Sequence, residues 1–190
     1  MFDGAARARV TLNQDFPAGL DRLWAVLGRR EYVERKYTAL GSSALRILRF
    51  EASDELIEVE LERRAPARIE GLPAWARLVP GRGWTLRQHT RWQRVGPGRV
   101  DVGLDLALAG GLVRATGVGA VAERSPALTR MTLDIETACE IPGIGAEAAR
   151  LFADEVGRAL REDHVFTVEY LTGCARASQA RDAGAGRRPD

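Results

Sequence analysis

Alternating apolar and polar positions dominate most of the chain, and this period of two predicts strands. The clearest run is Ile57, Val59 and Leu61, which alternate with glutamates and so predict one buried and one solvated face. Turn signals such as Gly96-Pro97-Gly98 separate the runs. The pattern predicts an antiparallel meander of six to seven strands, at about residues 7–13, 43–51, 57–62, 84–93, 100–108, 113–123 and 130–140.

Helical spacing appears in two places. After Pro17, residues 18–27 and 30–37 predict two short helices that follow the first strand. After residues 142–145 the period of 3.6 returns, and Ala146–Leu171 predicts one long helix. Gly157 lies within that helix, and a large side chain in its place is expected to fill space beside the helix.

An apolar sheet face must be covered, and the long C-terminal helix is the one predicted element that can cover it. A sheet of this width curled around a single helix encloses more volume than the helix fills. The order of elements therefore predicts an α+β helix-grip fold with an interior cavity. We expect residues 1–172 to form this domain and residues 173–190, rich in Arg, Ala and Gly, to form a disordered tail.

Short motifs accompany this order of elements. They are Phe16-Pro17-Ala18 before Leu23-Trp24, Tyr32 with Arg35-Lys36-Tyr37, Leu72-Pro73, Gln88 with Trp92, Gly117, Ile141-Pro142-Gly143-Ile144-Gly145 and Glu169-Tyr170-Leu171. Over about residues 7–172 the chain resembles the actinobacterial domain of unknown function 2505, within the START-like (Bet v 1-like, SRPBCC) superfamily. It departs from that family at Ala146-Glu147, where a Gly-Gly-Lys-Ile-Glu-like stretch is usual. The resemblance implies a helix-grip fold and a ligand cavity, without implying a reaction.

The inward faces of the strands and of the long helix are expected to line the cavity. Apolar ligand pockets carry a few placed polar groups, and Gln88, Thr90 and Thr137 fit that description. Each could equally be a hydrogen-bonded core residue. The expected lining is Arg63, Trp84, Leu86, Gln88, Thr90, Trp92, Val102, Leu104, Leu106, Met131, Leu133, Ile135, Thr137, Phe152, Val156 and Leu160.

Two arginines continue the inward phase of their strands. Arg63 follows Leu61, and Arg49 follows Leu45 and Ile47. Either guanidinium could hold a ligand carboxylate or carbonyl, or could extend from a strand end to solvent.

A short apolar segment lies between the third and fourth strands. Trp75, Leu78 and Val79 form its apolar face. This segment is a candidate portal at the cavity mouth, and the alternative is a plug that packs on the core.

His164 and Asp163 are the candidates for acid–base chemistry. Neighbours on a helix point about 100° apart, so we expect only one of them to face the cavity. His89 shares its phase with Arg87 and Arg91 and is expected to be solvated. The sequence holds no Gly-x-Ser-x-Gly, His-Glu-x-x-His or phosphate-binding glycine motif.

Composition narrows the function classes. The 190 residues suffice for one core, and no apolar run is long enough to span a bilayer. The N-terminus lacks the layout of a signal peptide, and two cysteines form neither a disulfide framework nor a metal motif. We therefore expect a cytoplasmic protein without cofactor or metal, which does not insert stably into membranes but can touch their surface transiently.

The charge distribution argues against nucleic acid as a partner. The net charge of +2 arises in residues 173–190, and the rest of the chain holds 24 basic and 24 acidic residues. A nucleic-acid-binding domain needs a concentrated basic surface. Of the 28 basic residues only Lys36 is lysine, a bias that a GC-rich genome explains.

The leading hypothesis is binding of a hydrophobic small molecule or lipid in the cavity. The first alternative is an enzyme resembling polyketide cyclases and aromatases, with His164 or Asp163 and a cavity arginine as its reactive groups. The second alternative is a non-catalytic interaction module with a filled core. The sequence carries no signal for the oligomeric state.

The domain boundary gives a first prediction. Because the tail has no apolar period, deletion of residues 175–190 should leave the melting temperature within a few degrees of the full chain. Differential scanning calorimetry measures this, and a large drop would show that the tail packs on the domain.

Overall fold

The computed structural model describes residues 5–66, 83–108 and 110–185, and it describes their side chains except for Pro66, Gly83, Trp84 and residues 174–185. The predicted portal residues Trp75, Leu78 and Val79 lie outside the described residues. The elements follow the predicted order. They are β1 (Ala6–Phe16), α1 (Leu20–Leu27), α2 (Arg30–Ala39), β2 (Ser43–Ala52), β3 (Leu56–Pro66), β4 (Gly83–Gly96), β5 (Arg99–Leu108), β6 (Val113–Ser125), β7 (Leu128–Cys139) and α3 (Gly145–Ala185).

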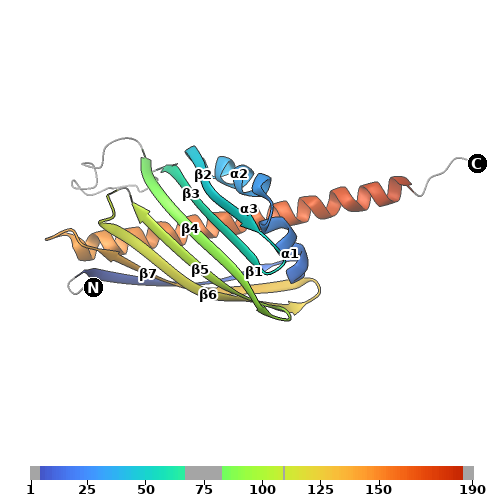
Figure 1. Cartoon of the computed structure of the whole chain (residues 1–190), viewed down its shortest axis with the longest axis horizontal. Coiled ribbons are helices and arrows are strands. Elements are labelled where there is room, and N and C mark those ends of the chain that lie inside the picture. Colours follow the sequence, from blue (N-terminus) through green and yellow to red (C-terminus); the bar gives the residue numbers. More distant parts are fainter. Residues whose placement is uncertain (1–4, 67–82, 109, 186–190) are drawn as a thin grey trace, which may run out of the picture.

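The strands form one antiparallel sheet of seven strands in the order β1-β7-β6-β5-β4-β3-β2. From β2 to β7, each strand therefore pairs with the next strand in the sequence. The first strand, β1, pairs with β7 and forms the edge opposite β2, with Val10 opposite Ile135. Figure 1 shows the curved sheet with α3 running behind it and α1 and α2 beside α3 at one end. This arrangement is the predicted helix-grip fold.

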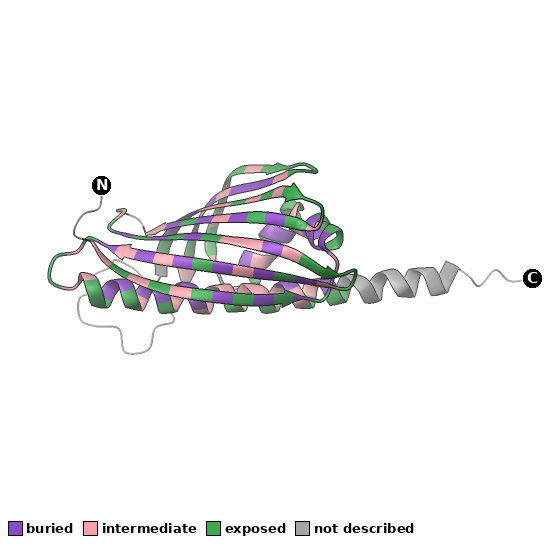
Figure 2. Cartoon of the chain, turned by 90° about the horizontal axis from the view of Figure 1, so that it is seen from below, coloured by how far each residue is buried: buried purple, intermediate pink, exposed green. Residues whose placement is uncertain are grey.

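The alternation predicted from the sequence matches the burial of the strand residues. Along β7 the inward residues from Thr129 to Cys139 are buried, and the residues between them are more exposed. Figure 2 shows this alternation along the strands and the cover that α3 gives to one face. The core is therefore the layer between the sheet and its helices, as the sequence pattern predicts.

The long helix lies mainly along β1, β7 and β6. Thr137 helps to fix it there, because its hydroxyl, fully buried, donates to the backbone oxygen of Ala149 at 2.8 Å. Ala149 and Phe152 are buried at this contact. The helix continues to Ala185, beyond the predicted end at Leu171, in a stretch where alanine and arginine favour helix. The independence of residues 1–172 stays a prediction.

The two short helices, α1 and α2, lie beside α3 on the same side of the sheet (Figure 1). In α1, Leu20 and Leu23 are buried, and Trp24 donates its indole N–H to the backbone oxygen of Ser53 at 3.0 Å. In α2, Tyr32 and Tyr37 are buried and face α3 and the sheet. None of the helices in the described part of the chain is long and apolar enough to cross a membrane.

Gly157 does not face the cavity, which corrects the sequence-based expectation. A Cβ at this position would lie 3.5 Å from Val10 Cγ2 on β1 and 3.4 Å from the guanidinium of Arg161. A large side chain there would press on β1 and would not fill ligand space.

The two contacts at Gly157 are ordinary van der Waals distances, so we predict that Gly157→Ala stabilises the protein. Removing glycine from a helix interior gains about 1 kcal/mol, which raises the melting temperature of a chain of this size by about 2–4 °C. Thermal unfolding measures the shift. Gly119→Ala is the matched comparison, since its Cβ would lie 2.2 Å from the backbone oxygen of Thr132 and should lower stability. Destabilisation by Gly157→Ala would contradict the packing described for α3.

Candidate functional site: two apolar cavities joined by a polar wall

Two cavities lie between the sheet and its helices. The first has about 90 Å³ of space accessible to the centre of a water molecule, and it lies where α1, α2 and α3 meet the sheet. The second has about 60 Å³ and lies further along α3. Because a water molecule needs roughly 10–15 Å³ of such space, each cavity holds several waters or a small organic group. Both cavities have mainly apolar walls. The residues that line both are Tyr37, Gln88, Leu104, Leu160 and Asp163.

Most of the cavity residues predicted from the sequence lie at these walls. The first cavity receives Gln88, Thr90, Trp92, Val102, Leu104, Met131, Leu133 and Leu160. The second cavity receives Arg63, Leu86, Gln88, Leu104, Leu106, Phe152, Val156 and Leu160.

Two predicted residues lie elsewhere, and one is not described. Ile135 and Thr137 are buried but line neither cavity, because α3 packs on β7 at this point. Thr137 is therefore the hydrogen-bonded core residue that the sequence left as an alternative. The side chain of Trp84 lies outside the described part.

Gln88 and Thr90 contact each other at the cavity wall. The amide nitrogen of Gln88 donates to the hydroxyl of Thr90 at 3.0 Å. Gln14 of β1, which the sequence did not single out, donates to the backbone oxygen of Leu160 at 2.9 Å. These bonds satisfy part of the polar capacity of the wall and leave the Gln88 side-chain oxygen as an acceptor beside both cavities.

Arg63 lies inside the protein. Only 9 % of its surface is exposed, and its guanidinium lies 4.7 Å from the ring centre of Tyr37. One terminal nitrogen donates to Ser42 Oγ at 3.0 Å, whereas the buried Nε finds no partner among the described residues. Arg63 thus presents a cation and an unused donor at the wall of the second cavity.

Arg49 lies on the outer face, which contradicts the inward phase expected from Leu45 and Ile47. The pairing of β2 with β3 shifts register between Ile47 and Arg49, and this irregularity turns the guanidinium to solvent. There Arg49 pairs with Glu51 at 2.8 Å and with Glu58 at 2.9 Å.

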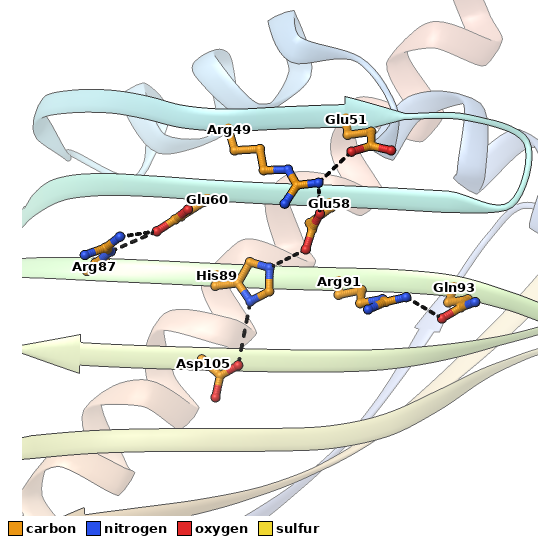
Figure 3. A network of polar contacts seen from close by, with 9 residues as sticks. All are labelled: Arg49, Glu51, Glu58, Glu60, Arg87, His89, Arg91, Gln93 and Asp105. Carbon is orange, nitrogen blue, oxygen red and sulfur yellow. Dashed lines mark hydrogen bonds and ion pairs between the residues drawn. The ribbon is translucent and has the colours of Figure 1, made fainter.

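His89 also lies on this outer face, as expected. Figure 3 shows its ring between two carboxylates, with Nε2 2.8 Å from Glu58 and Nδ1 3.8 Å from Asp105. The hydrogen bond from His89, helped by the charge of Arg49, holds the pKa of Glu58 below its ordinary value. This network stabilises the solvent side of the sheet and does not contact the cavities.

Both candidates for acid–base chemistry line the first cavity. The expectation that only one would do so is wrong, because Asp163 and His164 lie at the two edges of one helix face, with Leu160 and Thr167 between them. His164 uses Nε2 to donate to the backbone oxygen of Asp15 at 2.8 Å, and its ring packs edge-on against Phe16. His164 is thus held at the cavity edge by β1.

Asp163 forms a buried ion pair that the sequence analysis did not predict. Its Oδ2 lies 2.9 Å from Nζ of Lys36, and the two side chains are only 21 % and 12 % exposed. Burial alone would lower the pKa of Lys36, but the attraction of the Asp163 carboxylate outweighs it and raises this pKa above its ordinary value. Lys36 therefore stays an ammonium.

Tyr32 and Thr167 extend this polar cluster. Thr167 donates to the backbone oxygen of Asp163 at 2.7 Å, so Tyr32 supplies the proton for its own 2.6 Å bond to the Thr167 hydroxyl. Burial raises the pKa of Tyr32 to about 12, which keeps its hydroxyl protonated. The cluster joins α2 to α3 beside the first cavity.

The signal that could have identified α2 as a cavity wall is its spacing. Tyr32, Val33, Lys36 and Tyr37 recur at i, i+1, i+4 and i+5, so they share one helix face, and all four line the first cavity. The side chains that line the cavities but were absent from the expected set are Gln14, Phe16, Leu27, Tyr32, Val33, Lys36, Tyr37, Leu40, Ile57, Val59, Ala65, Glu155, Arg158, Ala159, Glu162 and Thr167.

No three His, Cys, Asp or Glu side chains among the described residues gather in a metal-binding arrangement. The buried thiol of Cys139 packs in the core. The polar groups at the cavity walls include the ion pair, Arg63 and the amide of Gln88.

The ion pair yields a stability prediction. Asp163→Asn leaves a buried ammonium unpaired and should lower the free energy of unfolding by about 3–5 kcal/mol. The double variant Lys36→Met/Asp163→Leu removes both charges and should recover most of this loss. Because the pKa of Lys36 is raised, the stabilisation is present below the ordinary lysine pKa and is lost as the pH rises through the folded value. Urea unfolding compares the variants, and an Asp163→Asn variant as stable as the unmodified chain would contradict burial of the pair.

Solved structures with this fold come from several kinds of protein. The Zhui aromatase/cyclase from Streptomyces sp. R1128 has a TM-score of 0.58 and 15% identity, and the match covers 90% of this chain and 98% of that one. Norcoclaurine synthase from Thalictrum flavum, solved with dopamine and hydroxybenzaldehyde, has a TM-score of 0.53 and 11% identity, with 90% of each chain covered. Ara h 8.0201 has a TM-score of 0.54 and 7% identity, and the match covers 88% of this chain and 99% of that one. At these identities the likeness shows the shared Bet v 1-like fold.

Sequence comparison gives the family. No curated protein matches the chain. The family model described as "Protein of unknown function (DUF2505)" matches residues 11–171, which is most of the chain. The protein therefore belongs to the DUF2505 family, whose helix-grip fold it shares with the Bet v 1-like proteins.

Proposed function

We propose that this protein binds a hydrophobic small molecule in the space between α3 and the sheet. The observation that carries the proposal is that two apolar cavities share Tyr37, Gln88, Leu104, Leu160 and Asp163 as one wall. Small movements of the two leucines would join the cavities into one volume. A dry apolar cavity of roughly 150 Å³ is known to bind benzene, so a ligand built on one aromatic ring suits the joined volume of the two cavities.

The similar solved structures agree with this proposal. Norcoclaurine synthase was solved with two small aromatic molecules, dopamine and hydroxybenzaldehyde. The protein would then be a cytoplasmic carrier or sensor, and its ligand would be a small aromatic or lipid-like compound. This role needs no cofactor.

The cyclase-like alternative has less support from the geometry. A general base needs a lone pair that can reach the substrate. The Asp163 carboxylate is held in an ion pair by Lys36 at 2.9 Å, and the bond from His164 Nε2 to the backbone oxygen of Asp15 leaves only Nδ1 of that ring as a base. Binding is therefore the function that these contacts favour.

Methionine supplies a direct test, because the chain holds only Met1 and Met131. Met131 lines the first cavity. In protein labelled with ¹³C at the methionine methyl groups, titration with ethylbenzene should shift the Met131 signal saturably and leave Met1 unchanged.

Two variants make the test specific. Leu104→Phe fills space at the shared wall and should remove the saturable shift. Val118→Phe adds the same group at a position that is 70 % exposed on the outer face of the sheet, and it should leave binding unchanged. A Met131 signal that ethylbenzene does not move would contradict ligand binding and favour the interaction module with a filled core.

A further inference from the structure

Lys36 stands apart from every other basic residue of the chain. It is the one lysine among 28 basic residues, and it lies at the wall of the first cavity. A lysine ammonium is a compact charge with three donors, whereas arginine presents a broad planar fork. A chain that uses arginine everywhere else thus keeps a compact donor at the wall of the first cavity, which no arginine lines among the described residues.

The surroundings of Nζ leave part of its donor capacity unused. Asp163 accepts one hydrogen bond at 2.9 Å. The ring centres of Tyr32 and Tyr37 lie 5.3 and 4.9 Å from Nζ and offer only their π faces. Among the described residues, Asp163 is the only hydrogen-bond acceptor that the structure gives to Nζ. An ammonium has three donors, so a ligand in the cavity can receive one of the others.

A buried ion pair is not explained by stability alone. Well-packed apolar side chains in the same places are often as stabilising or more so. A pair that also recognises a ligand has a reason to be kept inside an apolar cavity. A hydrocarbon ligand would displace any water at Nζ and leave the donor unpaired, which is unfavourable.

The local charge decides which acceptor fits. Lys36 and Asp163 together are neutral, so a carboxylate brought to Nζ would also meet the Asp163 carboxylate. A neutral carbonyl oxygen accepts a hydrogen bond without that repulsion. Arg63 lines the second cavity and not the first, with its guanidinium 4.7 Å from the ring centre of Tyr37, so the ion pair sets the charge beside Nζ in the first cavity.

We propose that Lys36 determines ligand specificity, its ammonium donating a hydrogen bond to the carbonyl oxygen of an otherwise apolar ligand such as an aromatic ketone. This inference rests on the proposed function and names the ligand class for the same cavity. It makes Asp163 a positioning residue, which holds the ammonium in place and keeps it charged.

A matched pair of probes tests the inference. Acetophenone and α-methylstyrene have nearly the same shape, and only acetophenone carries a carbonyl oxygen in place of the terminal methylene. A hydrogen bond to a charged group predicts that acetophenone binds roughly tenfold tighter or more. Both probes should shift the ¹³C-methyl signal of Met131.

The single lysine provides a second, independent readout. In protein labelled with ¹⁵N-lysine, the Nζ signal belongs to Lys36 without assignment, and acetophenone should shift it while α-methylstyrene should not. If both probes bind with equal affinity and the Nζ signal does not move, the role of Lys36 is overturned, whereas the proposed binding of a hydrophobic small molecule stands. Failure of both probes to move Met131 would overturn both. Tighter binding of benzoate than of acetophenone would overturn the assignment of a neutral carbonyl ligand.

Substitutions of Lys36 test whether this residue causes the preference for acetophenone over α-methylstyrene. Lys36→Met should bind acetophenone and α-methylstyrene equally, and Lys36→Met/Asp163→Leu should do the same without leaving a buried carboxylate unpaired. Arg35→Met is the control on the same helix, because Arg35 lies outward in an exposed pair with Glu31. The control should keep the full preference for acetophenone. A preference that survives in the folded double variant would contradict the role of Lys36.

Discussion

The concave face of the seven-stranded sheet is wider than one helix can cover, and the rest of the structure depends on this mismatch. The long helix packs mainly on β1, β7 and β6, where Thr137 donates to its backbone. Over β3, β4 and β5 the cover comes from α2 and from the far side of α3. Side chains do not fill this half completely, and the space that remains forms the two cavities.

The same mismatch explains why polar groups enter the interior from the helices. Where α2 approaches α3 across the cavity, Lys36 and Asp163 meet at 2.9 Å, and Tyr32 bonds to Thr167 at 2.6 Å. These contacts hold the two helices at a fixed distance beside apolar space. They also place donors where a ligand would lie, so one cluster both closes the fold and gives the cavity its chemical character.

The sequence predicted the fold well because alternation and helical spacing report burial directly. The inward phase of β4, β5 and β7 agrees with the positions of Gln88, Leu104 and Met131, which line the first cavity. The prediction failed where a local irregularity or tertiary packing overrides the period of two. Arg49 turns outward at a register shift between β2 and β3, and Ile135 is buried in the core without lining either cavity. Lys36 was missed because the partner of a buried charge lies 127 residues away, on another helix.

The central claim is that the space beside α3 is apolar ligand volume divided by movable side chains. Crystals pressurised with xenon test it most directly, because xenon enters dry apolar cavities and scatters strongly. We expect xenon in both cavities, in contact with Leu104 and Leu160 at the shared wall. An interior without xenon, or one filled by ordered water bonded to Lys36 and Gln88 throughout, would contradict the account.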